Sequence, residues 1–298
     1  MQPLVSIIIP TYGGDDTIIR AVKSVLNQTY KNIEVIVVDD NNPDTEARRK
    51  TQTYMDFFDN DDRVKYIKHE KNKNGAAARN TGVNAAKGYY ICLLDDDDIF
   101  YPKKIEKQVM YLENNPSFCA CYCWRKQGDN YICGEEVGDL SKSLLDLSFT
   151  PTTDALMIKK ECYLNLNGFD ETYRRHQDFE FMLRFYKKYK IGVVKEVLFE
   201  VIGNSVINEP YGQKLYDIKK QFFNQFGLEI EKINNNCPGY KEKVYAEHFG
   251  RAFKNMLRHG NILLAIKIYR EYGIEGGLEF WRVFFGCCFR ACKERISR

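Results

Sequence analysis

The sequence predicts an α/β fold, with a mixed, mostly parallel sheet flanked by helices and a helical extension at the C-terminus. Over the first third of the 298 residues, short apolar runs rich in Val and Ile alternate with amphipathic stretches, as in parallel strands joined by helices. Acidic residues follow several of these runs. From about residue 206 the chain reads as helical and polar, then as basic and aromatic. We therefore expect one domain over 1–205 and a helical region with a basic, aromatic tail over 206–298.

Each expected element rests on a local pattern. A β-branched strand over residues 5–9 stops at Pro10, and Asp15 or Asp16 can cap the amphipathic helix that follows. Gly75 opens an alanine-rich helix over 76–86. The remaining strands are expected at 35–38, 64–67, 90–94, 118–124, 155–158 and 197–201, and the remaining helices at 103–112 and 178–189.

Composition limits the classes of function. Lys plus Arg is 44 and Asp plus Glu is 41, and the formal net charge of +3 does not suggest a nucleic-acid partner. The N-terminus has no signal-peptide pattern, and no apolar run approaches the roughly 18–20 residues of a membrane span. We therefore expect a cytoplasmic protein whose ten cysteines are reduced thiols. Cys119, Cys121 and Cys123 alternate without a nearby His, which favours buried thiols over a zinc site.

Carboxylates gather where two expected strands end. Asp39 and Asp40 follow the strand over 35–38, and four aspartates at 95–98 follow the strand over 90–94. Ligands of open α/β sheets bind outside these carboxyl ends, and a bound cation relieves the repulsion between clustered acids. Mg²⁺ or Mn²⁺, which takes oxygen ligands and bridges substrate phosphates, suits such a site. A solvated acidic loop is the alternative.

Four motifs follow one another along the chain. They are Pro10-Thr11-Tyr12, Asp39-Asp40-Asn41, the helix start from Asn74-Gly75 to Arg79-Asn80, and the aspartates at 95–98. Together they resemble the family 2 glycosyltransferases of GT-A fold, a Rossmann-like nucleotide-binding architecture. The resemblance covers about residues 4–205. It implies a nucleotide diphosphate sugar as donor, with UDP the commonest nucleotide in relatives, and Mn²⁺ or Mg²⁺ as cofactor.

The resemblance also implies a donor site. Its nucleotide-sugar-binding residues would be Pro10, Thr11, Tyr12, Asp39, Asp40, Asn74, Gly75, Arg79, Asp95 and Asp96. Tyr12 would stack on the base, and Asp40, with Asp39 as a second candidate, would accept from the base N–H. The family's Gly-Ser after the acids is Asn41-Asn42 here, so the turn differs while the acids remain.

The acidic run would serve the sugar and the phosphates. By resemblance, Arg79 lies near the nucleotide and holds Asp95, which faces the ribose or the donor sugar. Asp97 would hold the metal that bridges the two phosphates. Because Asp96 is also an acid, the register of these roles is ambiguous by one residue, and Asp95 is a second metal-ligand candidate.

By the same resemblance, a further segment would supply the catalytic base. Residues 167–171 resemble the family's G-G-F-D-E, which precedes an acidic pair at a helix start; Asp178 matches the base, and Gln177 replaces the usual Glu. A helix N-terminus favours the ionised form of an acid, as a base requires. Helix capping is the alternative role for Asp178, and His176 is a weaker rival as base. Contacts to acceptor or donor are expected from Gln177, His176, Thr152 and Thr153.

These roles imply a single in-line displacement with inversion at the anomeric carbon. Asp178 would take a proton from an acceptor hydroxyl while a nucleoside diphosphate leaves. The Q-x-x-R-W motif of processive relatives does not occur in the sequence, so one sugar per encounter is expected. Many relatives build capsule, exopolysaccharide or O-antigen in bacteria, which makes a saccharide or a lipid-linked acceptor the expectation.

Two other functions stay open. A nucleotidyltransferase also uses a nucleotide, a metal and acids, but Gly13-Gly14 lacks the lysine of its phosphate loop. A degenerate nucleotide-sugar-binding subunit of a heteromeric transferase would not need both Asp97 and Asp178.

The tail has two interpretations. From Arg251 onward, ten Lys or Arg and four Glu are interspersed with aromatic residues. Such a segment fits an interfacial helix on the inner face of the plasma membrane. A helical appendage that packs on the core, or on a second subunit in a homodimer, is the alternative.

Overall fold

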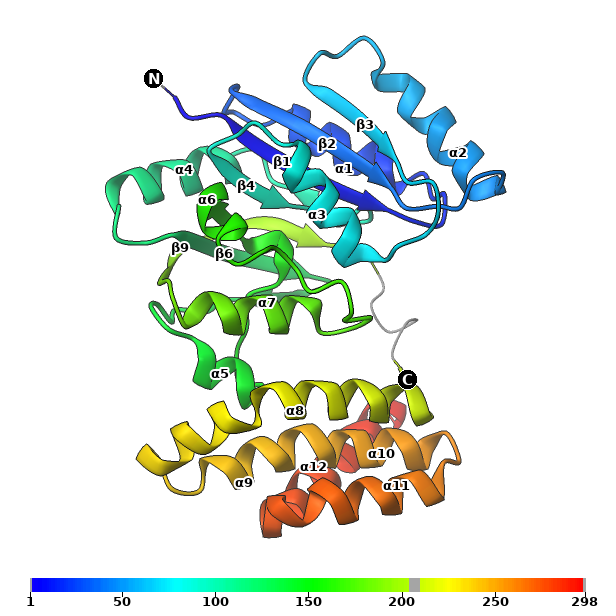
Figure 1. Ribbon diagram of the computed structural model, residues 1–298, viewed down its shortest axis with the longest axis vertical. Helices are drawn as coiled ribbons and strands as arrows, with labels where there is room; N and C mark the ends of the chain where they lie inside the picture. Colours follow the sequence, from blue (N-terminus) through cyan, green and yellow to red (C-terminus); the bar gives the residue numbers. More distant parts are fainter. Residues whose placement is uncertain (1, 204–209, 297–298) are drawn as a thin grey trace. The chain divides into compact units, whose positions relative to one another are not determined.

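The computed structural model describes residues 2–203 and 210–296 (Figure 1). The chain divides into two compact units, one of residues 1–140 and 151–204, the other of residues 141–150 and 205–298. The expected boundary between 205 and 206 lies outside the described residues. Residues 141–150, which were expected in the first region, group with the helical unit.

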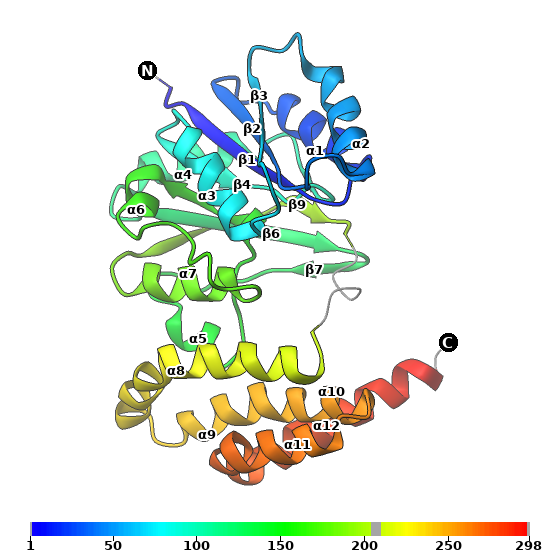
Figure 2. The same ribbon diagram turned by 45° about the vertical axis from the view of Figure 1, so that its right-hand side comes forward.

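The N-terminal half of the sheet is parallel. Strands β1 (Val5–Thr11), β2 (Ile33–Asp39), β3 (Val64–Lys68) and β4 (Tyr90–Leu93) pair in the order β3-β2-β1-β4. Helices α1 (Thr17–Leu26) and α2 (Glu46–Met55) lie on one face and α3 (Gly75–Ala85) on the other, as Figures 1 and 2 show. Residues of β1, β2 and β4 are almost all buried, which explains their continuous apolar runs.

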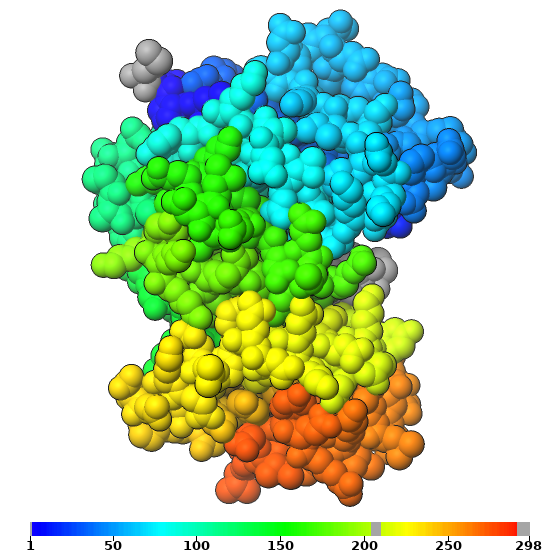
Figure 3. All heavy atoms as spheres, viewed as in Figure 1, coloured from blue at the N-terminus to red at the C-terminus, as the bar shows by residue number. Residues whose placement is uncertain are grey.

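The second half of the sheet is mixed. The sheet continues from β4 through β8 (Met157–Lys159), β6 (Ala120–Gln127), β9 (Ile191–Val201) and β5 (Ile99–Phe100), and β7 (Asn130–Ile132) pairs with β6. Only the β6–β9 pairing in this half is parallel among the described residues. Its helices are α4 (Lys104–Asn114), α6 (Lys160–Leu164) and α7 (Gln177–Tyr186). Figure 3 shows α3 (cyan) and α7 (green) on the same face of this unit.

Local details differ from the sequence expectations. Asp16 stands before α1, but its side chain makes no capping hydrogen bond. Strand β9 begins at Ile191 rather than near residue 197, and a register shift in the β6–β9 pairing follows Cys123. Residues 153–155 form a 3-10 turn, so β8 starts two residues later than expected. Short 3-10 turns also occur at Asp56–Phe58 and Ile274–Gly276.

The second unit is helical. It contains α5 (Ser141–Leu145), α8 (Gly212–Asn236), α9 (Tyr240–Tyr245), α10 (Arg251–Arg258), α11 (Ile262–Ile268) and α12 (Gly277–Ile296), with π-helical turns at Ala246–Gly250 and Tyr269–Gly273. Buried aromatic side chains form much of its core: Phe222, Phe226, Phe249 and Phe280. No helix among residues 2–203 and 210–296 is long and apolar enough to cross a membrane.

A lysine is buried inside this helical unit. Lys219 of α8 lies 3.0 Å from His248 Nδ1, and His248 Nε2 lies 2.9 Å from the carbonyl oxygen of Leu145. Because an ammonium group can only donate, His248 accepts at Nδ1 and donates at Nε2. Burial lowers the pKa of Lys219 to about 8.

Candidate active site

The carboxyl ends of β1, β2 and β4 and the start of α3 surround a pocket of about 330 Å³. Its lining residues are Pro10, Thr11, Tyr12, Asp40, Asn72, Asn74, Gly75, Ala78, Arg79, Asp95, Asp96 and Asp97. All except Asn72 and Ala78 were named from the sequence. Strand ends of a parallel sheet meet at one edge, so residues far apart in the chain converge there.

The four consecutive aspartates have four different environments. Asp95 accepts from Arg79 Nη2 at 2.6 Å, and Asp96 accepts from the Thr11 hydroxyl at 2.5 Å. Burial raises the pKa of Asp96 to about 7. Asp98 is buried and accepts from two backbone amides further along the chain. Within the part of the chain that the structure describes, the Asp97 side chain makes no hydrogen bond or ion pair with another residue, and burial, with Asp98 and Asp95 beside it, raises its pKa.

Arg79 links three elements around the pocket. It extends from α3, pairs with Asp95, and donates from Nη1 to Gln177 Oε1 at 3.3 Å. Burial opposes its charge, but Asp95, Asp154 and Asp178 together outweigh that effect and raise the pKa of Arg79 above its ordinary value. A Cβ at Gly75 would lie only 3.1 Å from Arg79 Nη1, so the glycine leaves room for the guanidinium. Asn74, with φ of 100°, caps α3 by accepting from the Ala77 amide.

The two carboxylates at the end of β2 accept hydrogen bonds from other groups of the protein. Asp40 accepts four hydrogen bonds, from His69 Nδ1, Asn72 Nδ2 and the amides of Lys73 and Asn74, at 2.7–2.9 Å. A carboxylate has about four acceptor positions, so Asp40 is saturated and holds the loop of residues 69–74. Its expected contact with the base N–H stays a prediction, and this geometry leaves little capacity for it.

Asp39 lies outside the pocket. Its side chain is fully buried, where it accepts from Tyr66 and Asn41 and lies 3.1 Å from Arg48 Nε. It therefore supports the end of β2. Sequence reasoning did not anticipate the roles of His69 and Asn72, because polar residues in a loop carry no periodic signal.

Asp178 lies in the first turn of α7, after His176 in a left-handed conformation (φ 59°). Burial raises the pKa of Asp178, although the Phe179 amide and Arg79 lower it. The helix-start amide favours the ionised form, as expected, but desolvation outweighs it, so the net shift of the pKa is upward. A carboxylate with a raised pKa is the stronger proton acceptor.

The other four side chains that were expected to contact acceptor or donor lie outside the pocket. Gln177 bridges Arg79 and the Tyr173 carbonyl. The ring of His176 lies 5.1 Å from that of Phe179. Thr153 is buried, and the buried hydroxyl of Thr152 has no hydrogen-bond partner among the described residues. None of these side chains lines the 330 Å³ pocket.

The oxygen ligands at the pocket suit a hard cation. Among the described residues, no three His, Cys, Asp or Glu side chains are arranged to hold a metal ion by themselves. Asp97 and Asp95 would provide carboxylate oxygens from one wall. Mg²⁺ and Mn²⁺ commonly complete such partial sites with water and substrate phosphates. The donor set therefore fits either ion only together with a bound diphosphate.

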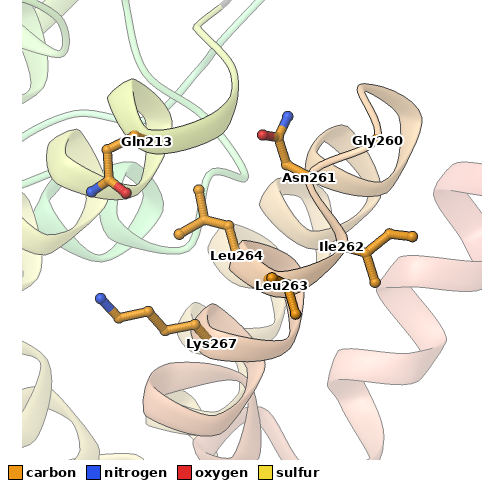
Figure 4. Close-up of a pocket in the computed structure, with 7 residues that line it drawn as sticks. All are labelled: Gln213, Gly260, Asn261, Ile262, Leu263, Leu264 and Lys267. Atoms are coloured by element: carbon orange, nitrogen blue, oxygen red, sulfur yellow. The ribbon is translucent and has the colours of Figure 1, made fainter.

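The helical unit has an open pocket of about 530 Å³ of a different kind. Figure 4 shows its lining residues on α8, on α11 and on the turn before α11: Gln213, Gly260, Asn261, Ile262, Leu263, Leu264 and Lys267. It contains one charged group and no carboxylate. The convergent acids and the arginine identify the smaller pocket as the candidate active site.

The family follows from sequence comparison. Residues 6–133 match the sequence profile of glycosyl transferase family 2. Over 210 residues the chain is 32% identical to an uncharacterised glycosyltransferase of Methanocaldococcus jannaschii, covering 66% of this chain and 70% of that protein. The chain belongs to glycosyltransferase family 2.

Other relatives of this family 2 glycosyltransferase are longer proteins. It is 40% identical over 298 residues to an uncharacterised glycosyltransferase of Rickettsia bellii, covering 93% of this chain and 39% of that one. It is 44% identical over 116 residues to the Escherichia coli UDP-Glc:alpha-D-GlcNAc-diphosphoundecaprenol beta-1,3-glucosyltransferase WfgD, covering 39% of this chain and 44% of WfgD. The chain thus spans less than half the length of these two relatives.

Solved structures show the same fold. S. aureus TarS 1–349 in complex with UDP-GlcNAc has a TM-score of 0.60 and 14% identity, covering 94% of this chain and 90% of that one. At this identity the likeness shows the fold alone. It confirms the expected GT-A fold with a helical C-terminal region.

Proposed function

We propose that this family 2 glycosyltransferase transfers one sugar, with inversion, from a UDP-sugar to a hydroxyl of a saccharide or lipid-linked acceptor in bacterial surface polysaccharide synthesis. The observation that carries the proposal is the pocket in which Tyr12, Arg79 and the aspartates at 95–97 converge. Asp178 lies close enough for its charge to interact with Arg79 and Asp95.

The donor fits the pocket by its chemistry. Tyr12 is 64% exposed at the rim, which leaves its ring free to stack on a base. Arg79 supplies a positive charge near the diphosphate, and its bond to Asp95 fixes the guanidinium. WfgD is named for UDP-Glc and the TarS structure is a complex with UDP-GlcNAc, and both support a UDP-sugar here.

The step is a balanced displacement. The acceptor oxygen forms a bond to the anomeric carbon, the bond from that carbon to the phosphate oxygen breaks, and the acceptor proton passes to an Asp178 carboxylate oxygen. The electron pair leaves with the nucleoside diphosphate. Mn²⁺ or Mg²⁺ held by Asp97, with Asp95 as second ligand, would neutralise charge developing on that leaving group. Attack opposite the leaving group inverts the configuration.

The test begins with binding. Ligands that bind only the native state raise its melting temperature, so nucleoside diphosphates and nucleotide sugars are screened with and without Mn²⁺. A Mn²⁺-dependent shift with UDP, followed by release of UDP from one UDP-sugar with an acceptor, supports the proposal. Binding without turnover on any acceptor would favour a degenerate nucleotide-sugar-binding subunit. Transfer of a nucleotidyl group would favour a nucleotidyltransferase.

The outer face of α12 supports a place for the enzyme at an anionic membrane surface. Phe280 and Cys287 face the core of the helical unit, whereas Leu278, Phe285 and Phe289 are 89%, 55% and 79% exposed. These three positions share the opposite face of the helix. Figure 2 shows the C-terminal part of α12 extending past α10 and α11.

Cations flank that apolar face. Arg282 is 80% exposed in its side chain, and Arg290 is also exposed. An apolar stripe beside arginines suits anionic headgroups, and WfgD is named for an acceptor on a polyprenol diphosphate. The acceptor and the enzyme would then meet at the inner leaflet.

Vesicle binding tests this surface. A Phe285→Ser/Phe289→Ser variant should lose most of its co-sedimentation with vesicles containing phosphatidylglycerol, while Leu228→Ser, which changes a 78% exposed leucine of α8, should keep it. Equal binding by both variants would contradict the proposal. A lipid-free dimer that only the double variant disrupts would assign the face to a homodimer instead.

A further inference from the structure

A buried carboxyl group lies behind the acidic loop of residues 95–98. Asp154 occupies the 3-10 turn Thr153–Ala155 just before β8, and it is 3% exposed. Its Oδ1 accepts a hydrogen bond from the Asp95 backbone amide at 3.0 Å. Strand β8 pairs with β4, and the loop continues from β4. The turn before β8 thus holds the loop that follows the neighbouring strand β4.

The same carboxyl also bonds to a second acid of the loop. A side-chain hydrogen bond joins Asp154 to Asp98. Burial raises the pKa of Asp154 well above its ordinary value. Asp154 therefore makes one bond to the backbone of the loop and one to its far end.

Asp98 extends this series of contacts toward the pocket. It accepts from the amides of Ile202 and Gly203, at 2.8 and 3.2 Å, where β9 ends. A Cβ on Gly203 would lie 1.8 Å from Asp97 Oδ2, so the backbone there lies directly against the Asp97 carboxylate. The position of Asp97 thus depends on a segment that Asp98 fixes.

A cation supports the buried pair. Arg125 of β6 interacts electrostatically with Asp154 and Asp98, although burial lowers the pKa of Arg125. Its buried Nε has no hydrogen-bond partner among the residues that the structure describes. An apolar residue at 154 would fill the volume without the cost of burying an acid. The bonds of Asp154 to Asp95 and Asp98 explain why an acid is buried at this position, whereas packing alone does not.

We propose that Asp154 is a positioning residue that holds the 95–98 loop, through the Asp95 amide and the Asp98 carboxyl, in the conformation that binds the donor diphosphate. This inference rests on the proposed function of the pocket. Asp154 touches no substrate, and it acts through Asp95 and Asp97. Substitution should therefore raise the donor KM and the Kd for UDP more than it lowers kcat.

Three variants of Asp154 separate positioning from general stability. Asp154→Asn keeps an acceptor for the Asp95 amide and a donor for Asp98, whereas Asp154→Leu removes both. Asp154→Ser is too short to reach both groups and serves if the leucine variant does not fold. Asp146→Leu is the matched control, because Asp146 is 5% exposed and accepts from the Ser148 amide in the other compact unit.

Calorimetry with UDP, with and without Mn²⁺, measures the effect alongside donor KM, kcat and melting temperature. We expect Asp154→Leu or Asp154→Ser to weaken Mn²⁺–UDP binding about 10- to 100-fold, as loss of outer-shell partners does. Asp154→Asn should bind nearly as wild type, and Asp146→Leu should lose melting temperature but no affinity.

The outcomes distinguish this inference from the proposed function. Wild-type UDP affinity in Asp154→Leu and Asp154→Ser, or an equal loss in Asp146→Leu, would overturn the inference alone. UDP binding that depends on Asp154 in a protein without transferase activity would overturn the proposed reaction and leave the inference standing. A wild-type protein that binds no nucleoside diphosphate would overturn both.

Discussion

The sheet unit and the helical unit use polar side chains in different ways. At the strand ends of the first, Asp40, Asp95, Asp96 and Asp98 each have named partners, and Asp97 alone among the five has no side-chain partner in the described structure. The helical unit is packed with aromatic rings and buries Lys219 against a neutral histidine. Single substitutions should therefore change chemistry in the first unit and stability in the second.

The sharpest test of that contrast is the proposed base. Asp178→Asn keeps the size of the side chain but removes the proton acceptor, so kcat should fall about 10²- to 10⁴-fold. Affinity for Mn²⁺–UDP should change little, because Asp178 does not line the donor pocket. Transfer assays measure kcat, and calorimetry measures the affinity for Mn²⁺–UDP. Wild-type turnover would remove Asp178 from the mechanism.

The pH profile tests the same group without mutation. Burial raises the pKa of Asp178, and only the deprotonated form can accept a proton. Activity is therefore lost as pH falls through the raised pKa. With donor and Mn²⁺ saturating, so that titration of Asp96 and Asp97 does not limit binding, kcat should drop about tenfold per pH unit below that pKa, with a midpoint above the ordinary value of about 3.9. A midpoint at or below that value would contradict the effect of burial.

Asp97 should show a binding defect rather than a chemical one. Asp97→Asn removes a charged oxygen ligand, so UDP binding in the presence of Mn²⁺ should weaken about tenfold or more, while metal-free UDP binding changes little. EDTA should reduce wild-type activity in the same direction. Full activity in EDTA would show that transfer does not need the cation.

Lys219 should affect stability alone. Its folded pKa of about 8 lies below the unfolded value of 10.5, so between these values the unfolded chain binds more protons and stability rises with pH. Relative to Lys219→Met, the wild type should gain about 1 kcal/mol of unfolding free energy between pH 7 and pH 9. Melting temperatures of both proteins across this range measure it. A stability difference between the two proteins that stays constant with pH, or altered transfer kinetics in Lys219→Met, would contradict the contrast between the two units.

The sequence was enough to predict the pocket residues that lie at the carboxyl ends of the parallel strands. Pro10, Asp40 and Asp95 each follow an apolar run, and Arg79 lies in the second turn of the helix that Gly75 opens. The parallel strand order brings these residues to one edge of the sheet. Strands in the mixed half were harder to predict, because the pattern at 191–196 is short and the pairing of β6 with β9 spans a register shift.

The Arg79–Asp95 pair, which the family resemblance implies, is present in the structure, but the other partnerships within the site could not be predicted. Whether Asp40 faces a ligand or is saturated by His69 and the 72–74 backbone depends on loop geometry, which has no sequence period. The direction of the pKa shift of Asp178 likewise depends on how much solvent the fold removes. Asp154 stood before an expected strand with no signal that its carboxyl would reach the Asp95 amide.

The saturation of Asp40 has a consequence for how the enzyme chooses among the cell's pool of activated sugars. A site with a dedicated hydrogen-bond partner rejects analogues that lack the matching group far more strongly than one that relies on shape and stacking. Asp40 is engaged by four donors of the protein itself. The part of the site that holds the nucleotide base would then recognise it mainly by ring size and by stacking on Tyr12. Fidelity would then reside at the opposite end of the donor, in the pocket around the sugar.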